Sequence, residues 1–442
     1  MPNWNKIYSS RCWINDQLVP ATIQIEQNKI ISVKEDKDGD AMDFRNAVIM
    51  PGGIDAHVHI NEPGRTDWEG FETATLAAAA GGITSIIDMP LNSSPVTTSV
   101  LALQRKLEAS TGKLNVNVGF YGGIIPGNEP AIEALCEQGV LGIKAFLTHS
   151  GIDEFPNVEK EELEIVMPVL KKYDRPLLAH CEISDEKHQA ALHQHPSSYK
   201  AYLQSRPGEW EVKAINLMLE LCARHHCKTH IVHVSSAHAL PLIEKAKQAG
   251  LPLTAETCPH YIYFSAEEIK DGETLLKCAP PIRSKENNEQ LKSAFQNGIL
   301  NFIASDHSPA PPQLKALDSG NFEKAWGGIA GLQFLLSATY TALSGTLPLE
   351  KIIPLLTTQP AKFLGLEQKG KLAPGMDADL VIWMPEESYI VEEDNILHRH
   401  KTTPYLGRRL KGKVEATIVN GKRVFHQNKF INKNAGTWLM KK

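Results

Sequence analysis

Residues 47–59 read Ala-Val-Ile-Met-Pro-Gly-Gly-Ile-Asp-Ala-His-Val-His, an apolar run that ends in two histidines. The apolar and β-branched side chains of residues 47–54 are typical of a strand that is buried on both faces. Seven further apolar runs of this kind occur along the chain, at residues 83–89, 115–121, 141–147, 176–181, 229–234, 252–257 and 301–305. The sequence therefore predicts eight buried strands, of which residues 47–54 form the first.

Amphipathic or alanine-rich segments that predict helices separate these runs. They include residues 71–80, 100–110, 159–173, 237–249 and 287–297. Strands that alternate with helices form right-handed βαβ units and a parallel sheet. Eight such units favour a closed (βα)8 TIM barrel over an open doubly wound sheet. No Gly-x-Gly-x-x-Gly turn follows the first strand, which argues against a dinucleotide-binding fold.

The two ends of the chain have a different texture. Residues 5–46 contain short alternating runs separated by turn signals, and residues 370–442 contain the same pattern. Asn420-Gly421 stands between two β-type runs, which is a strong hairpin signal. We therefore expect one small β-sandwich domain, built from residues 1–48 and 370–442, beside a barrel of residues 49–369.

Composition excludes several classes of protein. The 442 residues are 42% hydrophobic and 22% charged, and the formal net charge of −5 offers no basic surface for nucleic acid or an anionic membrane. No apolar stretch reaches the ~20 residues that span a bilayer, and no secretory signal is visible at the N-terminus. The seven cysteines have no framework spacing. Together these features predict a cytoplasmic protein with reduced thiols.

Three His-x-His pairs occur in the chain, at positions 57/59, 193/195 and 398/400. Chance alone predicts roughly 0.65 such pairs in this composition, so the spacing is uninformative without its context. The second and third pairs lie in polar stretches that predict solvated surface. His57 and His59 end an apolar strand, and residues two apart on a strand point to one face. Both imidazoles would then enter the barrel at its C-terminal mouth, where barrel enzymes carry their sites.

Lys144 lies within a predicted buried strand, where an isolated ammonium group is costly. Taken alone, this position favours a lysine that is paired with a barrel carboxylate. The alternative is that burial lowers the lysine pKa, leaving a neutral amine that reacts with carbon dioxide. The resulting carbamate would offer two oxygens that can bridge two divalent cations.

Three more predicted strands end in residues of metal-ligand type, namely His180, His233 and Asp306. One such histidine is more often a satisfied core residue, but their shared position at strand ends favours a common site. We expect His57, His59 and Asp306 to hold one ion and His180 and His233 to hold a second, with Lys144 between them. Imidazole and carboxylate ligands suit zinc and its neighbours. Two such ions activate water at neutral pH, and Asp306 would carry a proton from that water to the leaving nitrogen.

These residues together resemble the amidohydrolase superfamily, in its branch of dihydroorotases, hydantoinases and allantoinases. The residues Gly-Lys-Leu-Ala-Pro-Gly-Met-Asp-Ala-Asp-Leu at 370–380 and the composite β domain are also similar to that superfamily. The resemblance implies that Lys144 is carboxylated and bridges two metal ions, which replaces the ion-pair interpretation. It further implies a homotetramer.

The residue type at position 61 helps to distinguish the enzymes of this branch. Dihydroorotases carry an arginine two positions after the second histidine, where it grips the substrate carboxylate. An amide at this position suits a neutral substrate, although Arg65 is a nearby substitute. Longer strings are similar to allantoinases, at residues 61–70, 88–95, 256–261, 277–283 and 325–333.

This closer resemblance implies hydrolysis of the hydantoin ring of allantoin to allantoate. The alternatives are a hydantoinase or dihydroorotase, and, from another class, a non-catalytic assembly protein on the same fold. Such assembly proteins lose metal ligands, whereas all six are present here.

Substrate contacts are expected around the ligands. His149 stands where hydantoinases place a tyrosine that polarises the scissile carbonyl, so it would donate to the developing oxyanion; a loop histidine without a role is equally compatible with the sequence. Asn92 and Ser308 would bond the ureido group and ring amides, as would Asn61. Gly331 would allow the backbone to approach the ligand closely. Two further residues, Glu256 and His260, are candidates for orienting the ligands.

Overall fold

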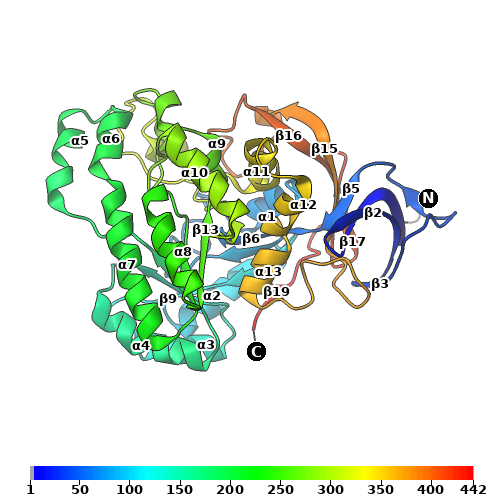
Figure 1. Ribbon diagram of the computed structural model, residues 1–442, viewed down its shortest axis with the longest axis horizontal. Helices are drawn as coiled ribbons and strands as arrows, with labels where there is room; N and C mark the ends of the chain where they lie inside the picture. The colour runs from blue at the N-terminus through cyan, green and yellow to red at the C-terminus, as the bar shows by residue number, and fades with distance from the viewer. Residues whose placement is uncertain (1–3, 442) are drawn as a thin grey trace.

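The computed structural model describes residues 4–441, apart from the side chain of Glu186. Figure 1 shows a larger body of strands surrounded by helices and, beside it, a smaller body of curved β-strands. The N-terminal strands and the strands near the C-terminus meet in the smaller body.

Parallel strands form the inner wall of the larger body. These strands are β6 (Gly53–Val58), β7 (Ile83–Asp88), β8 (Asn117–Phe120), β9 (Gly122–Gly123), β10 (Ile143–Phe146), β11 (Leu177–His180), β12 (Thr229–Ile231), β13 (Leu253–Thr257) and β14 (Phe302–Ile303). They pair in two arcs, β6-β7-β8 and β9-β10-β11-β12-β13-β14. Only Tyr121 separates β8 from β9, and a parallel bridge between Val58 and His307 joins β6 to the segment after β14. The two parallel arcs, with their covering helices, have the (βα) architecture that the alternation predicted.

Helices cover the outside of this wall (Figure 1). They are α1 (Phe71–Ala80), α2 (Val100–Ser110), α3 (Ala131–Glu137), α4 (Lys160–Lys172), α5 (Ala190–Gln194), α6 (Tyr199–Ser205), α7 (Gly208–His225), α8 (Leu240–Gln248), α9 (Pro259–Tyr263), α10 (Lys285–Gln296), α11 (Leu335–Leu343), α12 (Leu349–Leu356) and α13 (Thr358–Leu364). Local signals set several of their ends. The Ser99 side chain caps α2, and a capping box of Glu159 and Glu162 starts α4. None of the helices in residues 4–441 is long and apolar enough to cross a membrane.

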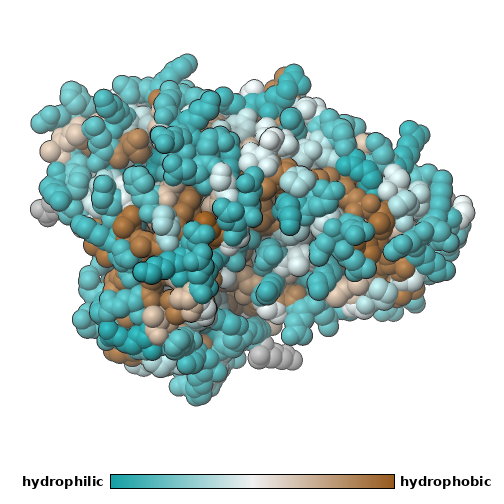
Figure 2. All heavy atoms as spheres, in the orientation of Figure 1, coloured by the Kyte–Doolittle hydropathy of each residue, from teal (hydrophilic) through white to brown (hydrophobic). Residues whose placement is uncertain are grey.

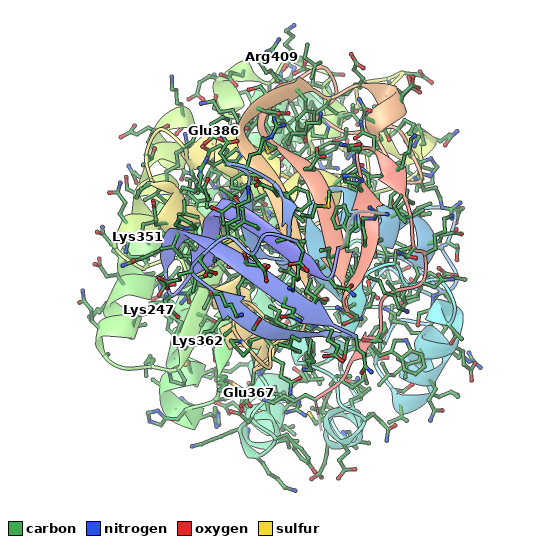
Figure 3. The ribbon with its side chains drawn as sticks, turned by 90° about the vertical axis from the view of Figure 1, so that its right-hand side faces the viewer. Lys247, Lys351, Lys362, Glu367, Glu386 and Arg409 are labelled. Carbon is green, nitrogen blue, oxygen red and sulfur yellow. The ribbon has the colours of Figure 1, made fainter. Side chains whose placement is uncertain are left out.

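A single nine-stranded sheet forms most of the smaller body. Its strands are β1 (Lys6–Ile14), β2 (Gln17–Glu26), β3 (Lys29–Lys34), β4 (Met42–Asp43), β5 (Val48–Pro51), β15 (Leu380–Ile390), β16 (Arg409–Val419), β17 (Lys422–His426) and β18 (Lys429–Phe430). Side chains of β1, β2, β15 and β16 share one apolar core, so the sheet curls over itself as the predicted sandwich does. Figure 3 views this domain end-on, with Glu386 of β15 and Arg409 of β16 near its upper edge.

The first predicted strand differs from the structure. Residues 47–54 contain two strands: β5 pairs with β1 and β15 in the small domain, whereas β6 pairs with β7 in the barrel. Gly52 lies between them, and a Cβ there would meet the Thr84 side chain at 2.2 Å. The pattern missed this break because strands buried on both faces have the same apolar composition in either sheet.

The last strand, β19 (Trp438–Leu439), returns to the barrel and pairs in parallel with β8. Arg175 donates a hydrogen bond to the carbonyl of Lys441 at 2.8 Å, which holds the end of this segment. All seven cysteines are buried and unpaired, as expected for reduced thiols. Figure 2 shows hydrophilic side chains over most of the viewed face, with apolar side chains in scattered patches.

Candidate metal centre

The predicted ligands meet at the carboxyl ends of the barrel strands. His57 lies on β6, Lys144 on β10 and His180 at the end of β11, while His233 and Asp306 lie in the loops after β12 and β14. Because parallel strands end at one face of a barrel, all six candidates, including His59, line one cavity of about 420 Å³.

The first group consists of His57, His59 and Asp306. Asp306 Oδ1 lies 3.2 Å from His57 Nε2 and 3.4 Å from His59 Nε2. Other partners occupy the second nitrogen of each ring: His57 Nδ1 lies 2.7 Å from Glu256 Oε1, and His59 Nδ1 lies 3.1 Å from the carbonyl of Leu91. These bonds turn both Nε2 atoms towards Asp306, so the three residues are arranged to hold one cation.

The second group is the pair His180 and His233. His180 Nδ1 lies 3.0 Å from His233 Nε2, and His180 Nε2 lies 2.8 Å from Glu182 Oε2. Burial lowers the pKa of both imidazoles, so they are neutral and can act as ligands. Burial alone would raise the pKa of Glu182. The guanidinium of Arg206 and the hydrogen bond between Glu182 and His180 outweigh burial and lower that pKa to about 2. A charged carboxylate therefore orients His180.

Lys144 lies among these groups with its Nζ 4.9 Å from the centre of the Phe146 ring and without a hydrogen-bond partner in residues 4–441. Its side chain is fully buried. Burial lowers the pKa of Lys144 to about 8, although Asp306 and Glu256 oppose the shift. The carboxylate partner that a structural role would require is absent from the part of the chain described. An unpartnered buried amine beside four imidazoles and an aspartate fits the carbamate that the resemblance implies.

Two of the candidate ligands have a strained backbone. Asp306 has φ of 44° and His233 has φ of 40°, both in the left-handed region that non-glycine residues rarely adopt. Such conformations cost on the order of 1–3 kcal/mol and cluster at functional sites. At both positions the strain directs a side chain into the cavity.

Comparison with known proteins identifies the family. A profile described as "Amidohydrolase family" matches residues 48–424, which include β6 to β14 of the barrel and the strands β5, β15 and β16 of the composite domain.

The chain belongs to the amidohydrolase family.

Within that family, the chain is clearly similar to allantoinases. The chain is 42% identical to the allantoinase of Arabidopsis thaliana, over 98% of this chain and 90% of the plant protein. It is 43% identical to the allantoinase of Saccharomyces cerevisiae, covering 87% and 84% of the two chains, and 38% identical to that of Escherichia coli, covering 91% of each. Among solved structures, L-hydantoinase (dihydropyrimidinase) from Arthrobacter aurescens superposes with a TM-score of 0.92 at 28% identity, covering 98% of this chain and 99% of the other.

The predicted substrate contacts of this amidohydrolase divide into two groups. Asn92, His149 and Ser308 line the cavity with the ligands. Asn61 and Gly331 are absent from its lining. The Asn61 amide is buried and points at the carbonyl of Pro309 (3.4 Å), and the Gly331 N–H donates to His307 Nδ1 at 3.2 Å. Asn61 has φ of 67°, a turn of the backbone that the sequence did not reveal.

Four residues that line the cavity or contact a candidate ligand were not predicted as site residues. Arg206, Lys277 and Trp326 line the cavity, and Glu182 bonds His180 from behind. Lys277 and Trp326 lie within strings that already resembled allantoinases, so a signal existed. Arg206 lies between two helices, away from any strand end, and nothing in its local sequence distinguishes it from a surface arginine. Glu182 shares the two-residue spacing that identified His57 and His59 and was detectable in the same way.

Proposed function

We propose that the protein is an allantoinase that opens the hydantoin ring of allantoin to give allantoate. The observation that carries this proposal is the match to curated allantoinases, which spans nearly the whole chain at 38–43% identity. The candidate ligand set at the barrel mouth supports hydrolysis, since every predicted ligand lines the same cavity.

We propose two zinc ions as cofactors. His57, His59 and Asp306 would hold one, and His180 and His233 the other. Carbon dioxide would add to the Nζ of Lys144, forming an N–C bond and releasing one proton, and the resulting N6-carboxylysine would bridge the ions. When bound, such ions acidify water and polarise the carbonyl that is attacked.

The remaining chemistry belongs to side chains of this chain. Asp306 would accept a proton from the attacking water and return it to the ring nitrogen as the C–N bond breaks. His149 lies at the rim with a largely exposed side chain, and its Nδ1 accepts a hydrogen bond from Gly151 N–H at 3.1 Å. Its Nε2 would donate to the developing oxyanion. Asn92 and Ser308 would bond the neutral amide and ureido groups.

Arg65 argues against dihydroorotate as the substrate. It was the one candidate that could replace the missing carboxylate-binding arginine. Its guanidinium donates to the carbonyl of Asn92 at 2.6 Å and to Glu154 at 3.0 Å, and it does not line the cavity. Arg206, which does line the cavity, is already paired with Glu182. A hydantoinase remains the alternative, because hydantoins lack that carboxylate too.

Other properties are proposed on the same basis. We propose the two domains that the sequence predicted, with the first boundary moved from residue 48 to Gly52 because β5 pairs with β1 and β15, and with β19 assigned to the barrel. We also propose a homotetrameric assembly, a cytoplasmic location, and no nucleic-acid or membrane partner.

Substrate comparison tests the proposed function. The purified protein, loaded with zinc, cobalt or manganese in bicarbonate, should release allantoate from allantoin faster than it turns over dihydroorotate or 5-substituted hydantoins. Preference for dihydroorotate would contradict the proposal. A protein that binds no metal and hydrolyses none of these substrates would instead support the non-catalytic alternative.

A further inference from the structure

A long excursion leaves the small domain between β15 and β16. It comprises residues 391–408, which we call the strap. Two backbone hydrogen bonds close its base, from Gly407 N–H to the carbonyl of Val391 (2.8 Å) and from Val391 N–H to the carbonyl of Arg408 (3.0 Å). In Figure 1 the strands on either side of it, β15 and β16, lie on the side of the small domain that faces α11 and the barrel.

The strap first contacts the barrel loop between β6 and α1. Arg399 N–H donates to Glu69 Oε1 at 3.2 Å, and the Arg399 guanidinium donates to the carbonyl of the same residue. His400 Nε2 lies 2.7 Å from the carbonyl of Asp67. This loop begins at the candidate ligand His59, and the strap contacts its other end, at Asp67 and Glu69.

The strap also contacts the barrel loop between β14 and α11. Thr403 donates to the carbonyl of Ala330 at 2.7 Å, and Leu397 N–H donates to Gln333 Oε1 at 2.8 Å. His398 Nε2 accepts a hydrogen bond from Gln333 N–H at 3.3 Å, and its ring lies 4.7 Å from the ring of His307. His398 is 1% exposed, so the expectation of a solvated surface pair at 398/400 is wrong for this member.

Glu69 and His307 meet beneath the strap. His307 Nδ1 accepts hydrogen bonds from the N–H groups of Gly331 (3.2 Å) and Leu332 (3.4 Å). A nitrogen that accepts carries no proton, so the ring is the tautomer protonated at Nε2. That Nε2 lies 3.4 Å from Glu69 Oε2, and both side chains are fully buried. Burying the Glu69 carboxylate with so few hydrogen-bond donors costs free energy, which favours a functional reason for its position.

The backbone of His307 is connected to two candidate ligands. Its carbonyl accepts a hydrogen bond from His59 N–H at 2.7 Å, and its own N–H follows directly on Asp306. Asp306 has the strained backbone described above. Any movement of His307 would therefore shift His59 and Asp306 together.

We propose that Glu69 and His307 are positioning residues for the first metal ion, and that the strap completes this arrangement from the small domain. The Glu69 carboxylate attracts the protonated nitrogen of His307 across 3.4 Å, and the backbone of His307 fixes the positions of His59 and Asp306 relative to each other. Arg399 holds Glu69 in turn. The inference rests on the proposed metal-dependent hydrolysis, but it predicts an effect on metal affinity that is measured without any substrate.

Glu69→Gln tests the proposal, because the amide keeps the size of the side chain and loses its charge. We expect zinc affinity, measured by competition with a chromophoric chelator, to fall about 10- to 100-fold, the range typical of residues that orient ligands. At subsaturating zinc, kcat should fall while KM for allantoin changes little. Glu393→Gln is the matched control, since it removes an exposed carboxylate from the same strap and should leave zinc affinity unchanged.

Arg399→Ala provides a second variant in case Glu69→Gln fails to fold. Arg399 is exposed, so its removal should be tolerated. The substitution removes the guanidinium bond to the Glu69 carbonyl and keeps the backbone N–H bond to the Glu69 carboxylate, so we expect zinc affinity to fall by less than the roughly 10-fold lower limit for residues that orient ligands. Wild-type zinc affinity in both variants would overturn the proposal, as would a lower melting temperature of the metal-free protein with zinc affinity unchanged. If zinc affinity falls as expected but allantoin is not hydrolysed, the positioning role stands and the proposed substrate is wrong.

Discussion

Two lysines buried in the same barrel have opposite surroundings. Lys106 of α2 is 1% exposed, and its Nζ lies 2.5 Å from Asp88 Oδ2 and 3.0 Å from the carbonyl of Met89. Lys144 of β10 is equally buried, but its Nζ has no hydrogen-bond partner among residues 4–441. The first lysine satisfies a buried carboxylate. The second is a costly place for a charge, which supports the proposed role of Lys144 as the residue that becomes carboxylated.

The two lysines should therefore affect stability differently when they are removed. Removing one member of a buried pair leaves the other uncompensated, so Lys106 supports the fold. Removing an unpaired ammonium relieves a desolvation cost, so Lys144 should be dispensable for stability and indispensable for activity. Four experiments can break or sharpen this contrast.

The largest effect is expected for Lys144→Ala. Activity should fall by more than the roughly 100-fold that is typical of residues that orient the ligands, because the proposed bridging carbamate itself would be lost. Short-chain carboxylic acids should restore part of the activity by replacing the carbamate oxygens. The assay is allantoate release with and without added acetate or propionate. Undiminished activity would remove the carbamate from the mechanism.

Lys106→Met should act on the fold instead. It leaves Asp88 buried without its cation, so the free energy of unfolding should fall by about 3–5 kcal/mol. Denaturant titration measures this, with Lys160→Met as the control. Lys160 forms an exposed pair with Glu220, whose loss should cost no more than about 1 kcal/mol. A Lys106→Met variant as stable as the wild type would contradict the prediction that Lys106, unlike Lys144, supports the fold.

Metal removal should distinguish the lysines in a third way. A ligand present at 100 times its Kd stabilises the folded state by about 2.7 kcal/mol. Dialysis against a chelator should therefore lower the melting temperature of the wild type, and added zinc should restore it. The zinc-dependent rise should shrink in Lys144→Ala and persist in Lys106→Met, as measured by calorimetry. An equal rise in both variants would exclude Lys144 from the metal site.

The smallest effect concerns a third buried lysine, Lys369, which lies 2.9 Å from Asp377 Oδ2 and also bonds Asp379. Burial opposes ionisation of Asp377, but Lys369 and Lys29 outweigh it and lower the pKa of that carboxyl below 3.8. A lowered folded-state pKa contributes stability above about pH 4, which is lost as the pH falls further. Asp377→Asn should remove this loss and cost up to about 1 kcal/mol at pH 7, allowing for solvent screening. Thermal unfolding at pH 3 to 7 would reveal it, and identical pH profiles would contradict it.

Periodicity and strand ends predicted most of the architecture and all six candidate ligands. The strand containing Lys144 was placed correctly because a buried strand is a short apolar run between turn signals. The site around it was less accessible. Asn61 was expected to face the substrate, yet its left-handed backbone turns the amide towards Pro309. His398 was expected on the surface because its neighbours are polar, whereas a contact with His307, 91 positions earlier, buries it. Local sequence contains neither backbone turns of this kind nor such long-range partners.

The passage from β5 to β6 bears on how the protein unfolds. Gly52 alone separates the two strands, so the chain leaves the small domain and enters the barrel without a linker. Near the other end of the chain, β19 pairs with β8. A cut at residue 52 would separate β1 to β5 from β15 to β18 and break the pairing of β5 with β15, and a cut before residue 438 would expose the edge of β8 that pairs with β19. The two bodies are therefore expected to melt in one cooperative transition, and neither should be recoverable alone as a stable fragment.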